Sequence, residues 1–252
     1  MNPRRQNKIR IDRLLVERGH ADSRQKAQAL ILAGKVLVDE QKIEKCGTLV
    51  NEESQLRLLG GSLRYVSRAG LKLEAAIDHF GVDPKGKICL DIGASTGGFT
   101  DCLLQRGASR VIAVDAGTNQ LDWKLRQDPR LTVMEQTNAR YLGFDQVGTL
   151  VELVTMDVSF ISSTLILPVL PPLLEENADL LVLVKPQFEV GLGQVGKGGI
   201  VRDPRLHEEA ISRVARKTAD LGFREMGRVE SALPGAEGNR EFFLHAIWPK
   251  SV

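Results

Sequence analysis

The strongest constraint in the sequence is a short apolar run that ends in an acid and a glycine and leads into a turn of small residues. Lys87–Gly93 is typical of a buried parallel strand, Gly93–Gly98 is the turn, and a helix is expected from Phe99 to Arg106. A second apolar run, Arg110–Asp115, again ends in an acid. Strand, glycine turn, helix, strand and carboxylate form the opening unit of a doubly wound α/β sheet.

Later apolar runs continue this alternation. The further predicted strands are Leu131–Met134, Val151–Asp157, Leu180–Lys185, Phe223–Val229 and Glu241–Trp248, and a helix is expected from about Leu206 to Leu221. With the first two runs they make about seven strands, most of them connected by helices. This order predicts a Rossmann-like α/β domain, a three-layer sandwich with a seven-stranded sheet in the middle.

The turn Gly93–Gly98 does not match the fingerprint of a dinucleotide site. Such a site needs G-x-G-x-x-G so that the backbone can approach a pyrophosphate, but here Ala94 follows the first glycine and the turn reads G-x-x-x-G-G. Asp91 is unfavourable beside a pyrophosphate and favourable beside a cation. S-adenosylmethionine carries an ammonium and a sulfonium but no phosphate, and Asp115 is placed to accept both hydroxyls of its ribose. The alternative is that these glycines only turn a tight corner.

The sequence therefore predicts a set of cofactor contacts around this turn and the neighbouring strand ends. They are Asp91, Gly93, Ala94, Ser95, Thr96, Gly97, Gly98, Phe99, Asp115, Asn138 and Asp157. Asn138 follows the third strand, where it would reach the adenine of the cofactor or simply cap a turn.

Two charged residues follow later strands of the predicted sheet. In open α/β sheets the ligand crevice lies outside the carboxyl ends of the strands, where Asp157 and Lys185 both stand. A charge at the end of so apolar a strand is costly unless it is paired, so a structural Asp157–Lys185 ion pair is the alternative to a catalytic one. Enzymes that methylate the exocyclic amines of bases carry a [DNS]-P-P-[YFW] motif, from which Asp157–Phe160 departs. Enzymes that methylate C5 of cytosine use a cysteine thiol that follows a proline, and neither Cys89 nor Cys102 does so. These exclusions favour a hydroxyl nucleophile.

The charge is unevenly distributed along the chain. Residues 1–72 carry 15 Lys and Arg against 8 Asp and Glu, whereas the remaining residues carry 19 against 24. A basic front and a mildly acidic body suggest that the front binds a polyanion, the alternative being a merely solvated surface. Helices are expected at 10–19 and 24–31, with Ser23 as an N-cap, before a strand in which Val36 and Val38 alternate with other residues.

This front resembles the S4 RNA-binding domain. The match rests on the run 10–12, Leu15, Ser23-Arg24, Ala27, Leu30-Ile31, Gly34, Val36 and Val38. The predicted RNA contacts are Arg10, Arg13, Arg24, Lys26 and Lys35, for which plain solubilising charge is the alternative. We expect the S4-like domain at 1–60, a linker at 61–64 and the larger domain at 65–252.

The larger domain resembles the FtsJ/RrmJ-type ribose 2′-O-methyltransferases, and its combination with an S4 domain resembles the TlyA family, often labelled haemolysin A. The blocks that carry the resemblance are 65–73, 91–100, 157–162, 184–189 and 238–242. The resemblance implies a class I S-adenosylmethionine-dependent fold and a Lys-Asp-Lys-Glu tetrad at Lys72, Asp157, Lys185 and Glu241. It also implies ribosomal RNA or ribosomal subunits as partner, with cytidine in 16S or 23S rRNA as the methylated nucleoside. Glu237 competes with Glu241 for the last position.

Composition and cysteine use narrow the class of protein. The three cysteines form no CxxC pair, the start lacks a signal-peptide core, and the most apolar run, Leu165–Leu174, holds three prolines. We therefore expect a soluble cytoplasmic protein with no metal site and no membrane partner. Two alternatives to the enzyme are a non-catalytic rRNA-binding protein and a membrane-lytic haemolysin.

Overall fold

The computed structural model describes residues 8–21, 23–59, 64–235 and 238–249. The chain divides into two compact units, Met1–Leu63 and Arg64–Val252. Each unit is described by itself below. The predicted boundaries at 60 and 64 stay predictions, because residues 60–63 lie outside the described part of the chain.

The small unit packs two short helices against short strands. Its elements are β1 (Lys8–Arg10), α1 (Ile11–Glu17), α2 (Arg24–Leu32), β2 (Val36–Val38), β3 (Gln41–Ile43), β4 (Leu49–Asn51) and β5 (Leu56–Leu58). Ser23 caps α2, since its Oγ accepts a hydrogen bond from the backbone N–H of Lys26 at 3.3 Å. The predicted strand is present as β2: Val36 and Val38 pack in the core of this unit, and Leu37 is buried as well. β2 is the central strand, with β3 on one side and β5 on the other, so Leu37 lies opposite Lys42 of β3 and Arg57 of β5.

The large unit is built on one seven-stranded mixed sheet. Its strands are β6 (Ile88–Ile92), β7 (Arg110–Val114), β8 (Leu131–Met134), β9 (Val151–Met156), β10 (Leu174–Val184), β11 (Arg224–Glu230) and β12 (Phe242–Ile247). They lie in the order β11-β12-β10-β9-β6-β7-β8. The five strands from β10 to β8 are parallel, and β12 runs antiparallel to both of its neighbours. The predicted Rossmann-like fold with seven strands is confirmed.

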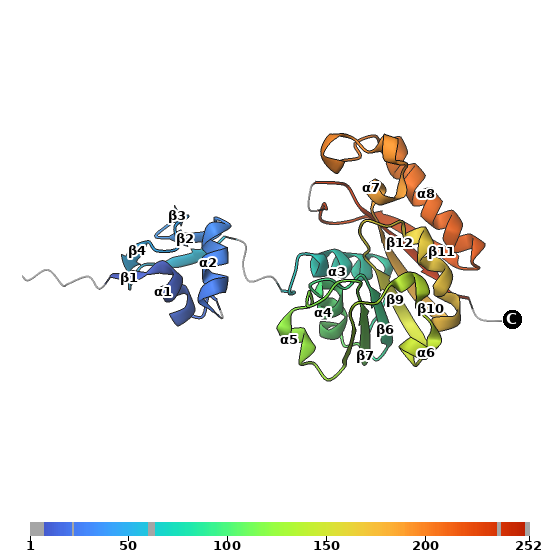
Figure 1. The fold of residues 1–252 in the computed structure, drawn as a ribbon, viewed down its shortest axis with the longest axis horizontal. Coiled ribbons are helices and arrows are strands. Elements are labelled where there is room, and N and C mark those ends of the chain that lie inside the picture. The colour runs from blue at the N-terminus through green and yellow to red at the C-terminus, as the bar shows by residue number, and fades with distance from the viewer. Residues whose placement is uncertain (1–7, 22, 60–63, 236–237, 250–252) are drawn as a thin grey trace, which may run out of the picture. The chain divides into compact units, whose positions relative to one another are not determined.

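Helices cover both faces of this sheet (Figure 1). On one face α3 (Ala69–Phe80) and α4 (Gly98–Gln105) bury apolar side chains against β6 and β7. On the other face α8 (Pro204–Asp220) and the short helix α6 (Phe144–Val147) both contribute side chains to a second core. The two further short helices are α5 (Trp123–Arg126) and α7 (Pro186–Glu189). The result is a three-layer sandwich whose strand ends are free to form a ligand crevice.

The connection from β9 to β10 contains no α-helix. It consists of three 3₁₀ turns, Ser163–Leu165, Leu167–Val169 and Pro171–Leu173. Its three prolines lack a backbone N–H and interrupt an α-helical hydrogen-bond ladder, which explains the short turns. The apolar side chains between the prolines are buried, so this segment covers the sheet as a helix would. β10 also begins earlier than predicted, with a shift in its pairing to β9 between Leu174 and Asp179.

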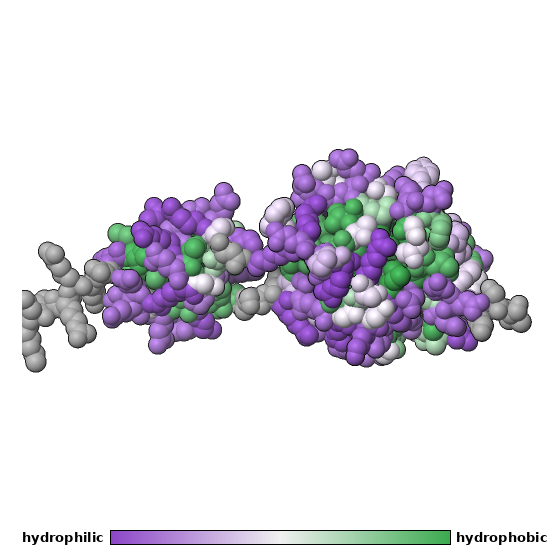
Figure 2. Space-filling model, turned by 90° about the horizontal axis from the view of Figure 1, so that it is seen from below, coloured by the Kyte–Doolittle hydropathy of each residue, from purple (hydrophilic) through white to green (hydrophobic). Residues whose placement is uncertain are grey.

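Hydrophilic residues cover most of the face seen in Figure 2, and hydrophobic residues gather in patches on the large unit. Within the described residues, no helix has both the length and the apolar character needed to cross a bilayer.

Candidate active site

The glycine turn after β6 is packed too tightly for side chains at three positions. Gly93 has a φ of +85°, and a Cβ there would lie 2.4 Å from the backbone oxygen of Asp157. Gly97 has a φ of +94°, and its Cβ would lie 2.3 Å from Leu125. A Cβ on Gly98 would lie 2.2 Å from the hydroxyl of Ser67. The turn therefore brings its backbone close to the end of β9, at the carboxyl edge of the sheet.

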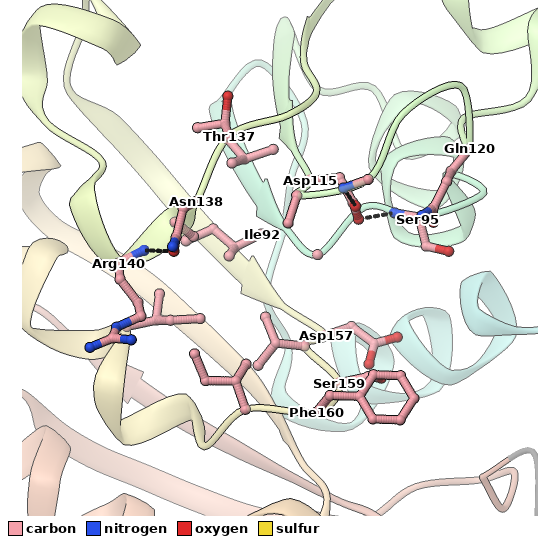
Figure 3. A pocket seen from close by; sticks show the side chains of 18 residues that line it. Ile92, Ser95, Asp115, Gln120, Thr137, Asn138, Arg140, Asp157, Ser159 and Phe160 are labelled. Carbon is pink, nitrogen blue, oxygen red and sulfur yellow. Dashed lines mark hydrogen bonds between the residues drawn. The ribbon is translucent and has the colours of Figure 1, made fainter.

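A cavity of about 570 Å³ opens beside this turn. In Figure 3, Asp115 and Ser95 lie on one side of it, and Asp157, Ser159 and Phe160 lie on the opposite side. The carboxylate of Asp115 accepts hydrogen bonds from the backbone N–H of Ser95 at 2.8 Å and of Gly117 at 2.7 Å. These bonds fix the carboxylate at the cavity wall, and each oxygen keeps a lone pair for the hydroxyls of a ribose.

Asn138 also lines this cavity (Figure 3). Its Oδ1 accepts a hydrogen bond from the backbone N–H of Arg140 at 3.1 Å and so caps the 3₁₀ turn Ala139–Tyr141. Both sequence interpretations of Asn138 are thus compatible with one geometry, because the capping residue stands at the cavity wall.

Asp91 lies beneath the glycine turn. It is fully buried, and its carboxylate accepts hydrogen bonds from the hydroxyls of Thr100 at 2.6 Å and Thr155 at 2.9 Å. Burial raises the pKa of Asp91 to about 6, although the two hydroxyls partly oppose that rise. Asp91 does not line any of the three cavities described in this subsection, so its direct contact with a cofactor cation stays a prediction.

The predicted residues Asp157 and Lys185 form an ion pair at the carboxyl edge. Lys185 Nζ lies 2.6 Å from Asp157 Oδ1 and donates a hydrogen bond to Ser159 Oγ at 2.8 Å. Asp157 Oδ1 is a buried atom whose contact with the ammonium lacks the angles of a hydrogen bond. Both side chains are more than four-fifths covered, which keeps this charge pair largely out of bulk water.

The other two predicted catalytic residues also meet. Lys72 Nζ of α3 donates a hydrogen bond to Glu241 Oε2 at 2.6 Å, although the two residues lie 169 positions apart. The Glu241 side chain is 3% exposed. Its competitor Glu237 lies outside the described residues.

A second cavity, of about 320 Å³, has Lys185 and Glu241 in the same wall. Its lining consists of Ser159, Phe160, Lys185, Gln187, Phe188, Val195, Gly199, Asn239 and Glu241. A third, smaller cavity of about 180 Å³ lies between the glycine turn and the same lysine, and Asp157 and Ser67 line it. Lys185 therefore stands where the space beside the glycine turn meets the space beside Glu241.

Phe160 belongs to the same rim but is 92% exposed. Its φ is +64°, an unusual value for an aromatic residue, and its ring centroid lies 5.3 Å from that of Phe188. The backbone thus holds a large apolar ring in solvent at the entrance of a cavity.

Sequence reasoning missed several residues that shape the site. Ser159 accepts a hydrogen bond from Lys185. The buried Asn239 binds the backbone of Val201 and Gly199 at 2.9 Å each, which holds the backbone around Gly199 at the cavity. Ser67 lines the small cavity, and its hydroxyl is a buried atom with no hydrogen-bond partner among the described residues. Ser159 stands two residues after Asp157 and Asn239 two before Glu241, so proximity to predicted catalytic residues was the available signal.

The five basic residues predicted to contact RNA are all exposed in the small unit. Arg10 and Arg24 both donate to the buried carboxylate of Asp12, at 2.9 to 3.0 Å, and Arg13 pairs with Glu17. The guanidinium of Arg10 lowers the pKa of Asp12 well below its usual range. Each guanidinium has five donors, so those used on a carboxylate leave others for a phosphate.

Comparison with known proteins identifies both parts of the chain. Residues 65–247 match the model of the FtsJ-like methyltransferases, and residues 9–56 match the S4 domain. The 16S/23S rRNA (cytidine-2′-O)-methyltransferase TlyA of Mycobacterium tuberculosis is 48% identical over 94% of this chain and 89% of its own length. Hemolysin A of Brachyspira hyodysenteriae is 42% identical over 95% of this chain and its own full length.

Solved structures agree with this result. A candidate hemolysin of Streptococcus thermophilus matches with a TM-score of 0.76 and 44% identity, over 98% of this chain and 90% of its own. An S-adenosylmethionine-dependent methyltransferase structure from Listeria monocytogenes matches at 14% identity and a TM-score of 0.55, over 73% of this chain and all of its own, which shows the fold alone. The chain belongs to the FtsJ-like methyltransferases and, with its S4 domain, to the TlyA (haemolysin A) family, and it is an enzyme with S-adenosylmethionine as cofactor.

Proposed function

We propose that this enzyme transfers a methyl group from S-adenosylmethionine to a ribose 2′-hydroxyl of ribosomal RNA, at cytidines of 16S or 23S rRNA or both. The names of two relatives support this substrate: the Mycobacterium tuberculosis protein and the 23S rRNA (cytidine-2′-O)-methyltransferase TlyA of Campylobacter jejuni, which is 38% identical over 73% of this chain and 71% of its own length. Ribosomal subunits are the proposed partner, and the cytoplasm is therefore the proposed place of action.

The observation that carries the proposal is the position of Lys185. Its ammonium group lies 2.6 Å from Asp157 and stands in the walls of both the small cavity beside the glycine turn and the cavity of about 320 Å³. A methyl donor in the first space and a ribose in the second would meet at this side chain. A purely structural ion pair would not need to line two adjoining cavities.

The residues around the glycine turn fit the cofactor. Asp115 would bind the ribose hydroxyls, Asn138 would lie beside the adenine, and the backbone of Gly93–Gly98 would follow the methionine part. The cavity beside Asp115 has a size typical of small-molecule sites. The bound cofactor would supply an electrophilic methyl group carried on a sulfonium. After transfer of the methyl group, the sulfur remains as a neutral thioether.

The remaining chemistry belongs to the chain's own side chains. The ribose oxygen would bond to the methyl carbon as the carbon–sulfur bond breaks, its electron pair staying on sulfur. The hydroxyl proton would pass to Lys185 Nζ, whose ammonium would first release a proton to water. Asp157 and Ser159 fix the position of that nitrogen. Glu241, held by Lys72, would accept from the substrate and orient the hydroxyl for in-line attack. Positioning of this kind contributes several kcal/mol to lowering the barrier.

Phe160 supports a nucleic-acid substrate in the second cavity. An exposed aromatic ring beside a cavity offers a surface on which a base outside its helix can stack, a contact worth about 1–3 kcal/mol. The S4 domain adds exposed basic residues for the phosphate backbone.

The test is transfer of radiolabelled methyl from S-adenosylmethionine to ribosomal subunits that lack ribose methylation. We expect label in rRNA with the wild-type protein, at least about a thousandfold less with Lys185→Ala, and an almost unchanged dissociation constant for the cofactor. Lys85→Ala, which removes an exposed lysine at the opposite edge of the sheet, is the matched control.

Each other outcome has a definite meaning. Most of the turnover retained by Lys185→Ala would reject the proposed role of that lysine. No label on any subunit, despite cofactor binding by the wild-type protein, would reject the substrate. Absence of cofactor binding as well would favour the non-catalytic rRNA-binding alternative.

A further inference from the structure

A buried carboxylate outside the proposed tetrad joins two segments that both contribute residues to the lining of the second cavity. Glu189 ends α7 and is 3% exposed. Its carboxylate accepts three hydrogen bonds: from Ser162 Oγ at 2.5 Å, from the backbone N–H of Ser163 at 2.8 Å and from Ser163 Oγ at 2.6 Å. These donors satisfy both oxygens without an arginine or a lysine.

The two ends of this contact belong to the two segments that carry the proposed chemistry. Ser162 and Ser163 close the segment after β9, which contains Asp157 and Phe160. Glu189 closes the segment after β10, which contains Lys185. The Asp157–Lys185 ion pair and the Phe160–Phe188 contact join the same two segments nearer the cavity.

A third element holds Glu189 in place. Arg213 of α8 donates from Nη1 to the backbone oxygen of Glu189 at 2.7 Å. α8 is the longest helix of the described residues and is anchored in the core through Ala210, Ile211 and Val214. The backbone of Glu189 is therefore fixed, and its carboxylate in turn fixes the positions of Ser162 and Ser163.

The residue type at this position matters. A buried carboxylate is costly unless donors satisfy it, and here three hydrogen donors face its two oxygens. A glutamine would place an NH₂ group opposite one of these donors, so that hydrogen bond would be lost. An aspartate is shorter by one methylene group and would not reach the serines. A residue that served only to fill space between α7 and the 3₁₀ turn would not need a charge.

We propose that Glu189 is a positioning residue of methyl transfer. By fixing the segment after β9 against the segment after β10, it sets the distance from Lys185 to Asp157 and Ser159 and keeps the Phe160 ring beside Phe188. The proposal rests on the proposed function, since it concerns the same cavity.

The activity test compares Glu189→Gln and Glu189→Asp with wild type. We expect kcat to fall about tenfold to a hundredfold in both, as for a small misplacement of reacting groups, while the cofactor dissociation constant stays within about twofold. Glu208→Gln, an exposed glutamate of α8, is the matched control and should keep full activity. Wild-type kcat in both Glu189→Gln and Glu189→Asp would overturn the positioning role.

A purely structural role would lower the melting temperature and leave kcat unchanged well below it, which would also overturn the proposal. If Glu189→Gln does not fold, Ser163→Ala removes one of the three hydrogen bonds and should lower kcat by a smaller factor.

A readout without activity separates this proposal from the proposed function. Amide hydrogen exchange should become faster in residues 157–165 and 185–190 of Glu189→Gln and stay unchanged in Glu208→Gln. Unchanged exchange in both segments would reject the positioning role even for an active enzyme. A wild-type protein that methylates no rRNA would reject the proposed function, while the exchange comparison would still test the link between the two segments.

Discussion

Asp12 in the small unit and Asp91 in the large unit are both fully buried, but their surroundings shift their pKa values in opposite directions. Asp12 accepts from Arg10, Arg24 and a glutamine, and the adjacent guanidinium lowers its pKa well below the usual range. Asp91 accepts from two threonine hydroxyls, and burial raises its pKa to about 6. The first carboxylate is neutralised by charge and the second only by dipoles.

The difference between the two carboxylates accompanies a difference in how exposed the neighbouring cations are in each unit. In the small unit the arginines reach Asp12 from the surface, so the carboxylate organises guanidinium groups that remain exposed to solvent. In the large unit the buried Lys72 and the largely covered Lys185 are paired with Glu241 and Asp157. A surface that binds phosphates tolerates solvated, mobile charges, whereas a site that orients one hydroxyl requires fixed, paired ones.

The largest expected effect comes from breaking a buried pair of the large unit. Lys72→Met leaves Glu241 buried without its cation, which should cost about 3 kcal/mol of unfolding free energy and abolish methyl transfer. Urea unfolding followed by circular dichroism measures the change. The double variant Lys72→Met/Glu241→Met should regain part of the stability and none of the activity. A single variant as stable as wild type would show that the pair is not the tight, desolvated one described above.

The pH dependence of stability tests the environment of Asp91. Because its folded pKa of about 6 lies above the unfolded value near 4, the unfolded chain ionises first, and stability falls as the pH rises from about 4 to 6. Asp91→Asn should abolish this loss, a difference from wild type of about 2 to 3 kcal/mol. Unfolding curves at pH 4, 5, 6 and 7 check it. Equal pH profiles of the two proteins would contradict the raised pKa.

Asp12 should change the stability with pH in the opposite direction. Its folded pKa is lowered, so its contribution to stability is present above the unfolded value near 4 and is lost as the pH falls toward the folded one. Asp12→Asn should remove that contribution at pH 7 and accelerate amide exchange in the small unit about tenfold, as for one charge-assisted hydrogen bond. Exchange in α1 and α2 is the measurement. Unaltered exchange at pH 7 would mean that the arginines contribute nothing through Asp12.

The smallest effect concerns a single surface charge. Lys35→Ala should weaken binding to ribosomal subunits by about two- to fivefold at low salt and reduce the slope of affinity against salt by about one. Filter binding at several salt concentrations measures both, with Lys85→Ala of the large unit as the control. An unchanged salt slope would assign Lys35 to solubility and not to RNA contact.

Much of the site could be predicted because several of its charged side chains come directly after predicted strands. Asp115, Asp157 and Lys185 each stand directly after an apolar run, and carboxyl ends of parallel strands share one edge of a sheet. Ser159 and Glu189 could not be found in this way. Their roles depend on which side chains meet across the two segments after β9 and β10, and a local pattern does not contain that information.

The sequence by itself determined the two units, the family, the parallel core of the sheet and the residue types at the site, because periodicity, glycine turns and motif blocks are local properties of the chain. Only the tertiary structure decided that Lys72 reaches Glu241 across 169 positions, that β12 lies antiparallel beside β10, and that Glu189 links the segments around Lys185. The physical reason is that burial and pairing of charges depend on packing between distant segments.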